Sequence, residues 1–171
     1  MGFQFEKLSV LVVEDTVPMR KLLVTVLENL GIRNIDVASD GEKAFEIFQK
    51  ENHDIILTDW VMNNMDGLDL TRAVRNNTNS PNRMAPIILI TGYSAWSRVE
   101  KARDDGVTEF LVKPFTANDI AKRIAHVIAK PRNFIETQEF FGPDRRRRVD
   151  PTYAGPFRRE DDNNGYSSGR D

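Results

Sequence analysis

Acidic and polar side chains stand directly after apolar runs, at spacings that could build one reactive site. Glu14 and Asp15 follow the first run, Asp59 comes 44 residues after Asp15, and Thr91 and Lys113 end two later runs. Carboxylates gathered at one point repel one another, so a divalent cation is their natural companion. Oxygen ligands alone favour Mg²⁺. We therefore expect a magnesium site formed by Glu14, Asp15 and Asp59.

Such a site suits phosphoryl transfer. Beside Mg²⁺, Asp59 could attack a phosphoryl group, because the cation and the Lys113 ammonium offset the charge that builds on the phosphoryl oxygens. Thr91 could then donate a hydrogen bond to a phosphoryl oxygen. Each residue taken singly is also explained as a helix cap or turn former. The joint spacing is what predicts the site.

The elements that must position these residues are five strands alternating with five helices. The apolar runs are rich in Val and Ile and almost continuously apolar, which is typical of parallel strands buried on both faces. We expect strands within 8–15, 34–39, 53–60, 85–92 and 108–115, and helices over 16–30, 40–50, 66–75, 94–105 and 116–130. The alternation predicts an α/β fold, a doubly wound parallel (βα)5 sheet spanning residues 1–130. The candidate side chains would share its carboxyl edge.

Composition excludes several classes of protein. The 171 residues include no cysteine, so a disulfide framework or a cysteine metal site is impossible. Neither a membrane-spanning run nor a signal-peptide pattern is present, so we expect no membrane insertion and a cytoplasmic location. His53 and His126 show no partner acid and no ligand spacing, and are interpreted as surface or packed residues.

Residues 8–130 resemble a response-regulator receiver domain, and "LTDWVMNNMDG" in particular resembles the CheY-like members. The resemblance implies a flavodoxin/CheY-like fold and a signalling protein rather than an enzyme, phosphorylated by a histidine kinase or phosphotransfer protein. It also implies a cis Lys113–Pro114 peptide. The implied roles are phosphoacceptor for Asp59, direct metal ligand for Asp15, water-mediated ligand for Glu14, carbonyl ligand for Val61, switch hydroxyl for Thr91, phosphate partner for Lys113 and rotating aromatic switch for Phe110.

The remaining 41 residues have a different character. After Lys130 the helical periodicity stops, and Gly, Pro, Arg, Asp, Asn and Ser dominate, which predicts a tail over 131–171 that is disordered when unbound. Its expected anchors are Phe134, Ile135, Phe140 and Phe141. Without a second core or a helix-turn-helix pattern, a specific DNA-binding domain is not expected. Residues 141–159 carry six Arg and two Asp, a local +4, and 160–171 carry four acids and one Arg, a local −3.

The tail also contains a degenerate repeat. "GPDRR" at 142–146 and "GPFRR" at 155–159 each come with an Arg-x-x-Asp pair: Arg147 with Asp150 directly after the first copy, and Arg158, within the second copy, with Asp161. An arginine can bind guanine O6 and N7 or stack on the base, Asp can accept from guanine, and further arginines can pair with phosphates. A ligand that requires guanine recognition twice and phosphate neutralisation twice is cyclic di-GMP.

The Arg-x-x-Asp pair resembles the inhibitory cyclic-di-GMP site of diguanylate cyclases, and a CheY-like receiver with this tail resembles the CheY-like cyclic-di-GMP effectors (the Cle group). The resemblance implies capture of cyclic di-GMP by a segment of about 139–162, and docking on the flagellar motor switch protein to control motility and surface attachment. The candidate ligand residues are Asp144, Arg145, Arg146, Arg147, Arg148, Asp150, Tyr153, Arg158, Arg159 and Asp161.

Two alternatives remain open from the sequence. In the first, the chain is a conventional single-domain response regulator phosphorylated at Asp59, and its tail is passive. In the second, the arginine run is a nonspecific nucleic-acid arm. The second alternative accounts for the charge of the tail but not for the repeated Gly-Pro-x-Arg-Arg.

Overall fold

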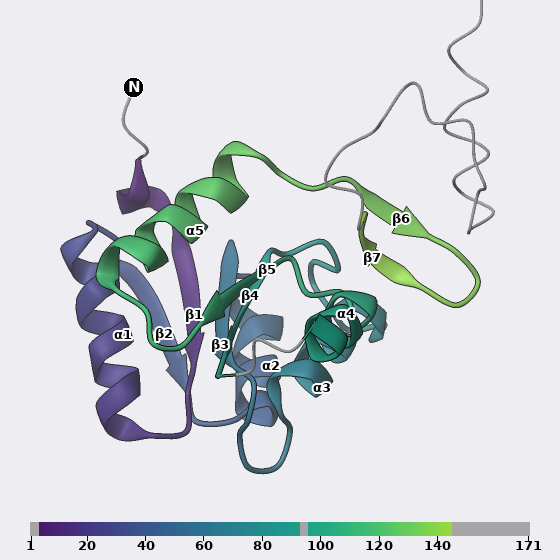
Figure 1. Ribbon diagram of the computed structural model, residues 1–171, viewed down its shortest axis with the longest axis horizontal. Coiled ribbons are helices and arrows are strands. Elements are labelled where there is room, and N and C mark those ends of the chain that lie inside the picture. The colour runs from purple at the N-terminus through teal and green to yellow at the C-terminus, as the bar shows by residue number, and fades with distance from the viewer. Residues whose placement is uncertain (1–3, 93–95, 145–171) are drawn as a thin grey trace, which may run out of the picture.

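A five-stranded parallel sheet lies at the centre of the chain in the computed structural model, which describes residues 4–92 and 96–144 (Figure 1). The strand order is β2-β1-β3-β4-β5, with every neighbouring pair parallel. The strands are β1 (Ser9–Val13), β2 (Asn34–Ala38), β3 (Ile55–Asp59), β4 (Ile87–Thr91) and β5 (Glu109–Val112). The expected doubly wound α/β receiver fold is confirmed.

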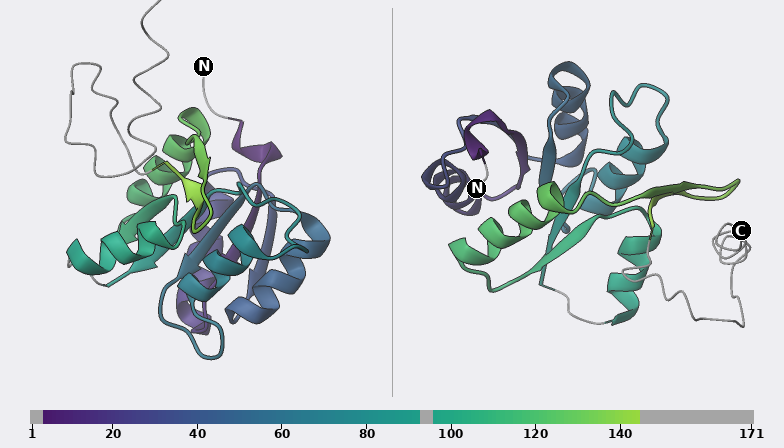
Figure 2. Two further views of the ribbon diagram at one scale, coloured as in Figure 1. Left: turned by 90° about the vertical axis from the view of Figure 1, so that its right-hand side faces the viewer. Right: turned by 90° about the horizontal axis from the view of Figure 1, so that it is seen from above.

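Five helices cover the two faces of this sheet, as Figure 2 shows. They are α1 (Val17–Asn29), α2 (Gly41–Glu51), α3 (Gly67–Asn76), α4 (Trp96–Asp104) and α5 (Ala117–Ala129), preceded by a short 3₁₀ turn, Phe5–Lys7. α1 and α5 pack on one face through residues such as Leu27 and Ile124. α2 and α3 pack on the other through residues such as Phe48 and Leu70. In residues 4–92 and 96–144, no helix has the length and apolar character needed to span a bilayer.

Among the helices whose starts the structure describes, α2, α3 and α5 begin with a side-chain cap and α1 does not. Asp66 and Thr116 each form a reciprocal capping box at the starts of α3 and α5, and the Asp40 carboxylate accepts from the Lys43 amide at the start of α2. Thr16, expected as the cap of α1, occupies that position without a side-chain cap bond. Its hydroxyl instead donates to Glu14 Oε1 at 3.0 Å. The Thr16 hydroxyl therefore binds Glu14 at the carboxyl edge of the sheet and does not cap α1.

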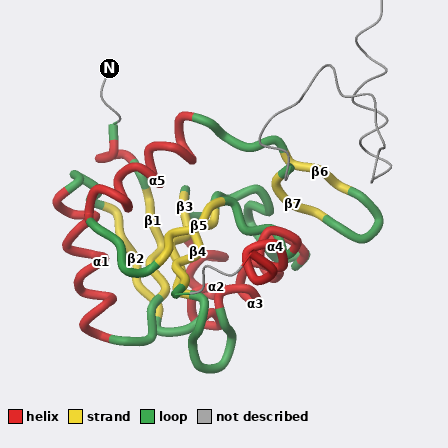
Figure 3. Tube along the Cα trace, in the orientation of Figure 1, coloured by secondary structure: helices red, strands yellow, loops and turns green. Residues whose placement is uncertain are grey.

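A β-hairpin follows α5, where the sequence predicts disorder. β6 (Phe134–Glu136) pairs antiparallel with β7 (Phe141–Pro143), and Figure 3 shows the two strands beyond the end of α5. The prediction of a disordered tail from Pro131 is therefore wrong for residues 131–144. Residues 145–171 lie outside the described part of the chain.

The hairpin is ordered because its aromatic rings find cationic partners on the receiver body. The guanidinium of Arg75 lies 5.0 Å from the centre of the Phe134 ring, and that of Arg83 lies 3.7 Å from the Phe141 ring. The two phenylalanine rings also contact each other, with centroids 5.5 Å apart. The expected anchors Phe134 and Phe141 thus hold a folded hairpin rather than isolated points of a loose tail.

Arg75 is able to serve this contact because the fold buries it completely. Its guanidinium donates to three backbone carbonyls, those of Gly106 (3.0 Å), Arg83 (2.7 Å) and Ala85 (2.7 Å), and to the Thr108 hydroxyl (3.3 Å). Burial lowers the pKa of Arg75 to about 9, which leaves it charged at neutral pH. One side chain therefore joins α3, the loop before β4, the turn before β5 and the hairpin.

Candidate functional site

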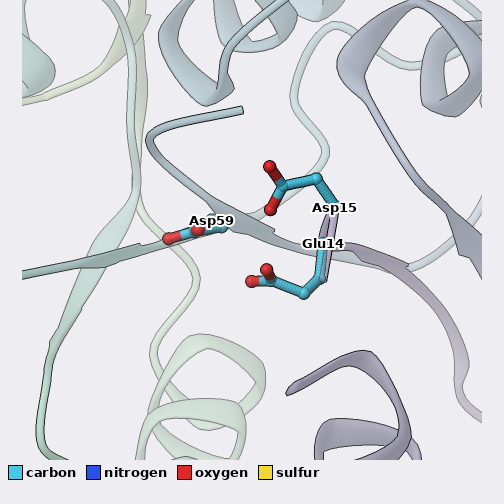
Figure 4. A group of neighbouring side chains, drawn as sticks. All are labelled: Glu14, Asp15 and Asp59. Atoms are coloured by element: carbon cyan, nitrogen blue, oxygen red, sulfur yellow. The ribbon is translucent and has the colours of Figure 1, made fainter. Parts of the chain in front are cut away.

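Three carboxylates meet at the carboxyl edge of the sheet. Glu14 and Asp15 follow β1 directly, and Asp59 is the last residue of β3, the strand that pairs with β1. One oxygen from each of the three side chains lies within 4.8 Å of the other two. Figure 4 shows the carboxyl groups of Glu14 and Asp15 directed toward Asp59. The structure thus brings together the three side chains that the sequence predicts as metal ligands.

Glu14 is the most deeply buried member of this cluster. Its Oε1 accepts from the Thr16 amide and hydroxyl, whereas its Oε2 is buried with no hydrogen-bond partner among the described residues. Desolvation, assisted by the negative charge of Asp59, raises the pKa of Glu14 to about 7. A buried carboxylate oxygen without a donor, beside two more carboxylates, fits a divalent cation bound by oxygen ligands.

Asp59 already has donors on one side. Its Oδ1 accepts from the Trp60 amide at 3.0 Å and lies 3.2 Å from the Lys113 ammonium. Lys113 follows β5 across the sheet, and its peptide bond to Pro114 is cis, as expected. A carboxylate held between an acidic cluster and an ammonium group has the surroundings that a phosphoryl acceptor needs, because both a cation and Lys113 can stabilise charge on transferred oxygens.

The other three candidate residues of the receiver surround this centre. Thr91 is buried at the end of β4, one position beyond Ile90, the cross-strand partner of Asp59. Phe110 in β5 is only 8% exposed and packs in a cluster with Trp60, Leu89 and Ala102. The Val61 side chain is 60% exposed. Phe110 therefore occupies an inward position, and the Val61 side chain faces solvent at the rim.

The interpretation of both histidines as surface or packed residues is confirmed, because His53 is buried and His126 is exposed, but each also has an acidic partner that the sequence did not indicate. His53 is fully buried, with Nε2 2.7 Å from Asp36 Oδ2 and its ring stacked on Phe48. His126 Nε2 lies 3.6 Å from Glu109 Oε1. The partners escape sequence analysis because they come from distant strands that only the folded sheet brings near.

Glu109 is a second buried carboxylate centre, remote in sequence from the first. Its side chain lies 3.5 Å from both Arg123 and Arg132, besides His126. Arg132 also donates to the Asp144 carbonyl at 3.1 Å, and the Asp144 amide donates to the Asn133 carbonyl at 2.7 Å. Asp144 is thus fixed through its backbone. The other candidate ligand residues, Arg145 to Asp161, lie outside the described residues.

Comparison with known proteins decides the family. A model described as response regulator receiver domain matches residues 10–125, and the sheet order and acidic edge lie within that range. The chain belongs to the response regulator receiver family. This receiver is 35% identical over 122 residues to a probable chemotaxis protein CheY of Rhizobium etli, covering 71% of the chain and 93% of the relative. It is 32% identical over 123 residues to chemotaxis protein CheY of Pseudomonas aeruginosa, covering 72% and 98%.

A solved relative shows an occupied metal site. The receiver domain of a sensor histidine kinase from Pseudomonas aeruginosa has a magnesium ion coordinated in its active site cleft. It superposes on this receiver with a TM-score of 0.65 at 27% identity, covering 72% of this chain and 98% of that one. The β6–β7 hairpin begins beyond residue 125, where the family match ends.

Sequence reasoning missed the residues that attach the hairpin. Arg75 and Arg83 gave no signal, because an arginine at the end of a helix or in a loop is ordinarily solvated. A signal for the hairpin did exist in the two apolar pairs, Phe134–Ile135 and Phe140–Phe141, separated by four polar residues. That pattern is compatible with two short strands and a turn.

Proposed function

We propose that this receiver is a CheY-like signalling effector that binds cyclic di-GMP through its arginine-rich segment and docks on the flagellar motor switch protein. The observation that carries the proposal is the duplicated Gly-Pro-x-Arg-Arg, each copy with an Arg-x-x-Asp pair. The chain enters this segment from Asp144, whose backbone is bonded to Arg132 and Asn133. A fixed starting point lowers the entropy cost of bringing the segment and the receiver to one ligand or partner.

The chemistry of the repeat matches the chemistry of the nucleotide. Each Arg-x-x-Asp pair supplies a bidentate donor for guanine O6 and N7 and a carboxylate acceptor for guanine N–H groups. The remaining arginines of 145–159 neutralise the two phosphates. Tyr153 offers a ring for stacking on a base. Two pairs for two guanines make the dinucleotide the ligand class that uses the whole repeat.

The decisive experiment is a titration of cyclic di-GMP into the full chain by calorimetry. Arg147→Ala, Asp150→Ala, Arg158→Ala and Asp161→Ala are each expected to weaken binding at least about fivefold, since a good bidentate pair supplies about 1–3 kcal/mol. Arg170→Ala and Asp171→Ala are matched controls of the same residue types beyond the segment, and should bind as the parent does. Equal affinities for all six variants would contradict the proposal.

At the acidic edge, we propose that Asp59 accepts a phosphoryl group from a histidine kinase or phosphotransfer protein. A carboxylate oxygen of Asp59 attacks phosphorus, and the bond from phosphorus to the donor nitrogen breaks as the acyl phosphate forms. Lys113, whose ammonium lies 3.2 Å from Asp59 Oδ1, would stabilise the charge that develops on the transferred oxygens. Glu14, Asp15 and Asp59, with the Val61 carbonyl, are the proposed holders of Mg²⁺, which when bound neutralises charge on the transferred oxygens.

Switching would follow from the same residues. Thr91 is the proposed hydroxyl that binds the new phosphoryl group, and Phe110 the aromatic ring that repacks in response. The buried Phe110 in contact with the cluster around α4 supports this role, because a repacking ring would change the surface formed by α4 and β5. Phosphorylation and nucleotide binding use separate sites, so both can operate in one molecule.

The proposed setting is the cytoplasm, with recruitment to the flagellar motor. A binding assay with the purified motor switch protein tests this part, with cyclic di-GMP and a phosphoryl mimic added separately and together. Binding that neither addition increases would contradict ligand-controlled docking.

The conventional phospho-switch with a passive tail is the second candidate. The acidic cluster beside Lys113 favours it, because Glu14, Asp15, Asp59 and Lys113 all lie in the receiver. It predicts that the tail variants leave motor binding unchanged. A nonspecific nucleic-acid arm instead predicts binding to any duplex that weakens steeply with salt, which gel shifts at low and high salt measure directly.

A further inference from the structure

A charged groove lies between β5 and α5, on a different part of the fold from the acidic edge. It encloses about 480 Å³ and is lined by Leu111, Val112, Asp119, Lys122, Arg123 and His126. β5 is the last strand of the sheet, so within residues 4–92 and 96–144 its outer edge has no neighbouring strand. The floor is apolar, since Val112 is 41% exposed beside Leu111. The groove therefore offers apolar contact along β5 and cations along α5.

The charge around the groove is positive. Residues 117–132 carry four Lys or Arg against Asp119 alone, and the nearest carboxylate of β5 is Glu109, for a net +2 without His126. The Asp119 carboxylate accepts hydrogen bonds from the Thr116 amide and hydroxyl at the start of α5, and these bonds lower the pKa of Asp119. The Glu109 carboxylate already lies beside the side chains of Arg123, Arg132 and His126. An acidic segment is thus the complementary occupant.

The chain carries such a segment on a short tether. Residues 160–171 contain Glu160, Asp161, Asp162 and Asp171 against Arg170, a net −3. The tether starts at Asp144. Arg132 contacts both the Asp144 carbonyl and Glu109, and the other partners of Glu109, Arg123 and His126, line the groove. Sixteen residues from 144 to 160 can span about 50 Å, whereas α5 is only about 20 Å long. The segment can therefore reach any point of the groove.

The intervening residues limit what else can occupy it. Residues 145–159 carry six Arg against Asp150, a net +5, and would be repelled by the cations of α5. A tethered segment of opposite charge acts at an effective concentration in the millimolar range, so weak pairing suffices to populate the contact. Because the acidic residues 160–171 come after the basic residues 145–159, the chain between them and Asp144 is long enough for the acidic residues to contact the receiver.

We propose that residues 160–171 dock in the β5–α5 groove of their own chain and cover it. The contact needs no nucleotide. One consequence rests on the proposed function: Asp161 belongs to the second Arg-x-x-Asp pair, so cyclic di-GMP bound there would compete with the docked state and uncover the groove. The segment is then an internal competitor for any partner that uses β5 and α5.

A spin label tests the docking directly in the full chain. The protein has no cysteine, so S168C gives a unique labelling position. The amides of Val112, Lys122 and His126 are expected to lose NMR intensity in the labelled protein, while those of Lys21 and Thr25 on α1 keep theirs. The loss should shrink at high salt, because the screening length falls from about 10 Å at 0.1 M to about 3 Å at 1 M.

Charge reversal supplies the specific control. Lys122 is exposed, so Lys122→Glu should leave the fold intact and restore the lost intensities. Combining it with Glu160→Lys and Asp162→Lys should bring the loss back, whereas Lys21→Glu on α1 should change nothing. Uniform broadening over the receiver, or a charge swap that does not recover the contact, overturns the proposal. So does the absence of any loss, which would place the acidic residues on the tail's own arginines.

Two further measurements distinguish the docking proposal from the nucleotide proposal. A mixture of spin-labelled and isotope-labelled molecules should show no intensity loss, since the contact is within one chain; loss in the mixture would overturn it. Cyclic di-GMP is then added to the labelled protein. Recovery of the groove amides supports competition, and persistence of the loss despite calorimetric binding removes the competition while leaving the docking. No calorimetric binding at all defeats only the nucleotide proposal.

Discussion

The guanidinium of Arg75 stacks over the ring of Phe134 at 5.0 Å, which joins the end of α3 to a hairpin nearly sixty residues further along the chain. The same guanidinium donates to the carbonyls of Arg83, Ala85 and Gly106. A buried arginine whose donors are satisfied in this way stabilises the fold and presents a flat cationic face to an aromatic ring. The hairpin is thereby part of the receiver body.

Replacing Arg75 should destabilise the whole receiver. Arg75→Met removes the donors of three backbone carbonyls, and leaving buried acceptors unpaired costs about 1–3 kcal/mol each. We expect a loss of at least about 3 kcal/mol in the free energy of unfolding, measured by urea denaturation. The control is Arg72→Met on the same helix, whose ion pairs with Asp69 and Asp105 are part-exposed. That variant should lose about 1 kcal/mol or less.

Replacing Phe134 should release the hairpin while preserving the receiver. Phe134→Ala removes the contacts with Arg75 and Phe141, so the amides of Thr137 and Asp144 should lose most of their protection from hydrogen exchange. The amides of β1 and β3 should keep theirs, because local opening leaves the central sheet closed. Equal loss of protection in the sheet and the hairpin would mean that the two unfold as a single unit.

Gly142 should tolerate no side chain. A Cβ there would lie 3.2 Å from the Gly106 Cα and 2.6 Å from the Phe140 ring, and the Gly106 backbone has little freedom to retreat because Arg75 binds its carbonyl. Gly142→Ala should displace β7 and lower hairpin protection as Phe134→Ala does. Gly92→Ala is the control, since a Cβ there meets nothing within 4 Å. Full protection in Gly142→Ala would show that β7 can shift without cost.

The burial of Glu14 predicts a pH-dependent stability in the absence of divalent cations. Its pKa is raised from 4.5 to about 7 in the folded state, so the folded protein binds the proton more tightly than the unfolded chain. This contribution is fully present below about pH 4.5 and is lost as pH rises through about 7. Urea denaturation from pH 5 to pH 8 should show the loss, and Glu14→Gln should remove it. A parallel pH dependence in both proteins would contradict this origin.

The acidic edge should respond to a phosphoryl mimic only when Asp59 is intact. With Mg²⁺ and beryllofluoride, the NMR signals of the Thr91, Phe110 and Val99 amides are expected to shift. A group bound at Asp59 would accept a hydrogen bond from the Thr91 hydroxyl, and the Phe110 ring would repack. Asp59→Asn should abolish these shifts, and Lys113→Met should require more ligand. Asp54→Asn is the control, since Asp54 lies one residue before β3 and its carboxylate accepts from the Ser9 amide. Unmoved Phe110 and Val99 signals in the parent protein would contradict the switch.

Much of the receiver could be predicted because its signals are local and repeated. Continuous apolar runs such as that of β3 predict strands buried on both faces, and a parallel sheet brings strand ends to one edge. Spacing therefore predicts that Glu14, Asp15, Asp59 and Lys113 share this edge, and the structure brings oxygens of the three carboxylates within 4.8 Å of one another and the Lys113 ammonium to 3.2 Å from Asp59. Gly142 and Pro143, predicted as part of a ligand repeat, also have a structural role, because β7 contains them.

The sequence by itself determined the strand and helix order, the acidic edge and the opposed charges of the tail, since each depends on residues close together or on a repeated period. Only the tertiary structure decided the partners of Glu109, His53 and Arg75, and with them the folded hairpin. These contacts join side chains far apart in sequence, and their free energy comes from burial that exists only once the sheet is covered. The sequence around an arginine run or a single phenylalanine does not show which distant residues these side chains will contact in the folded protein.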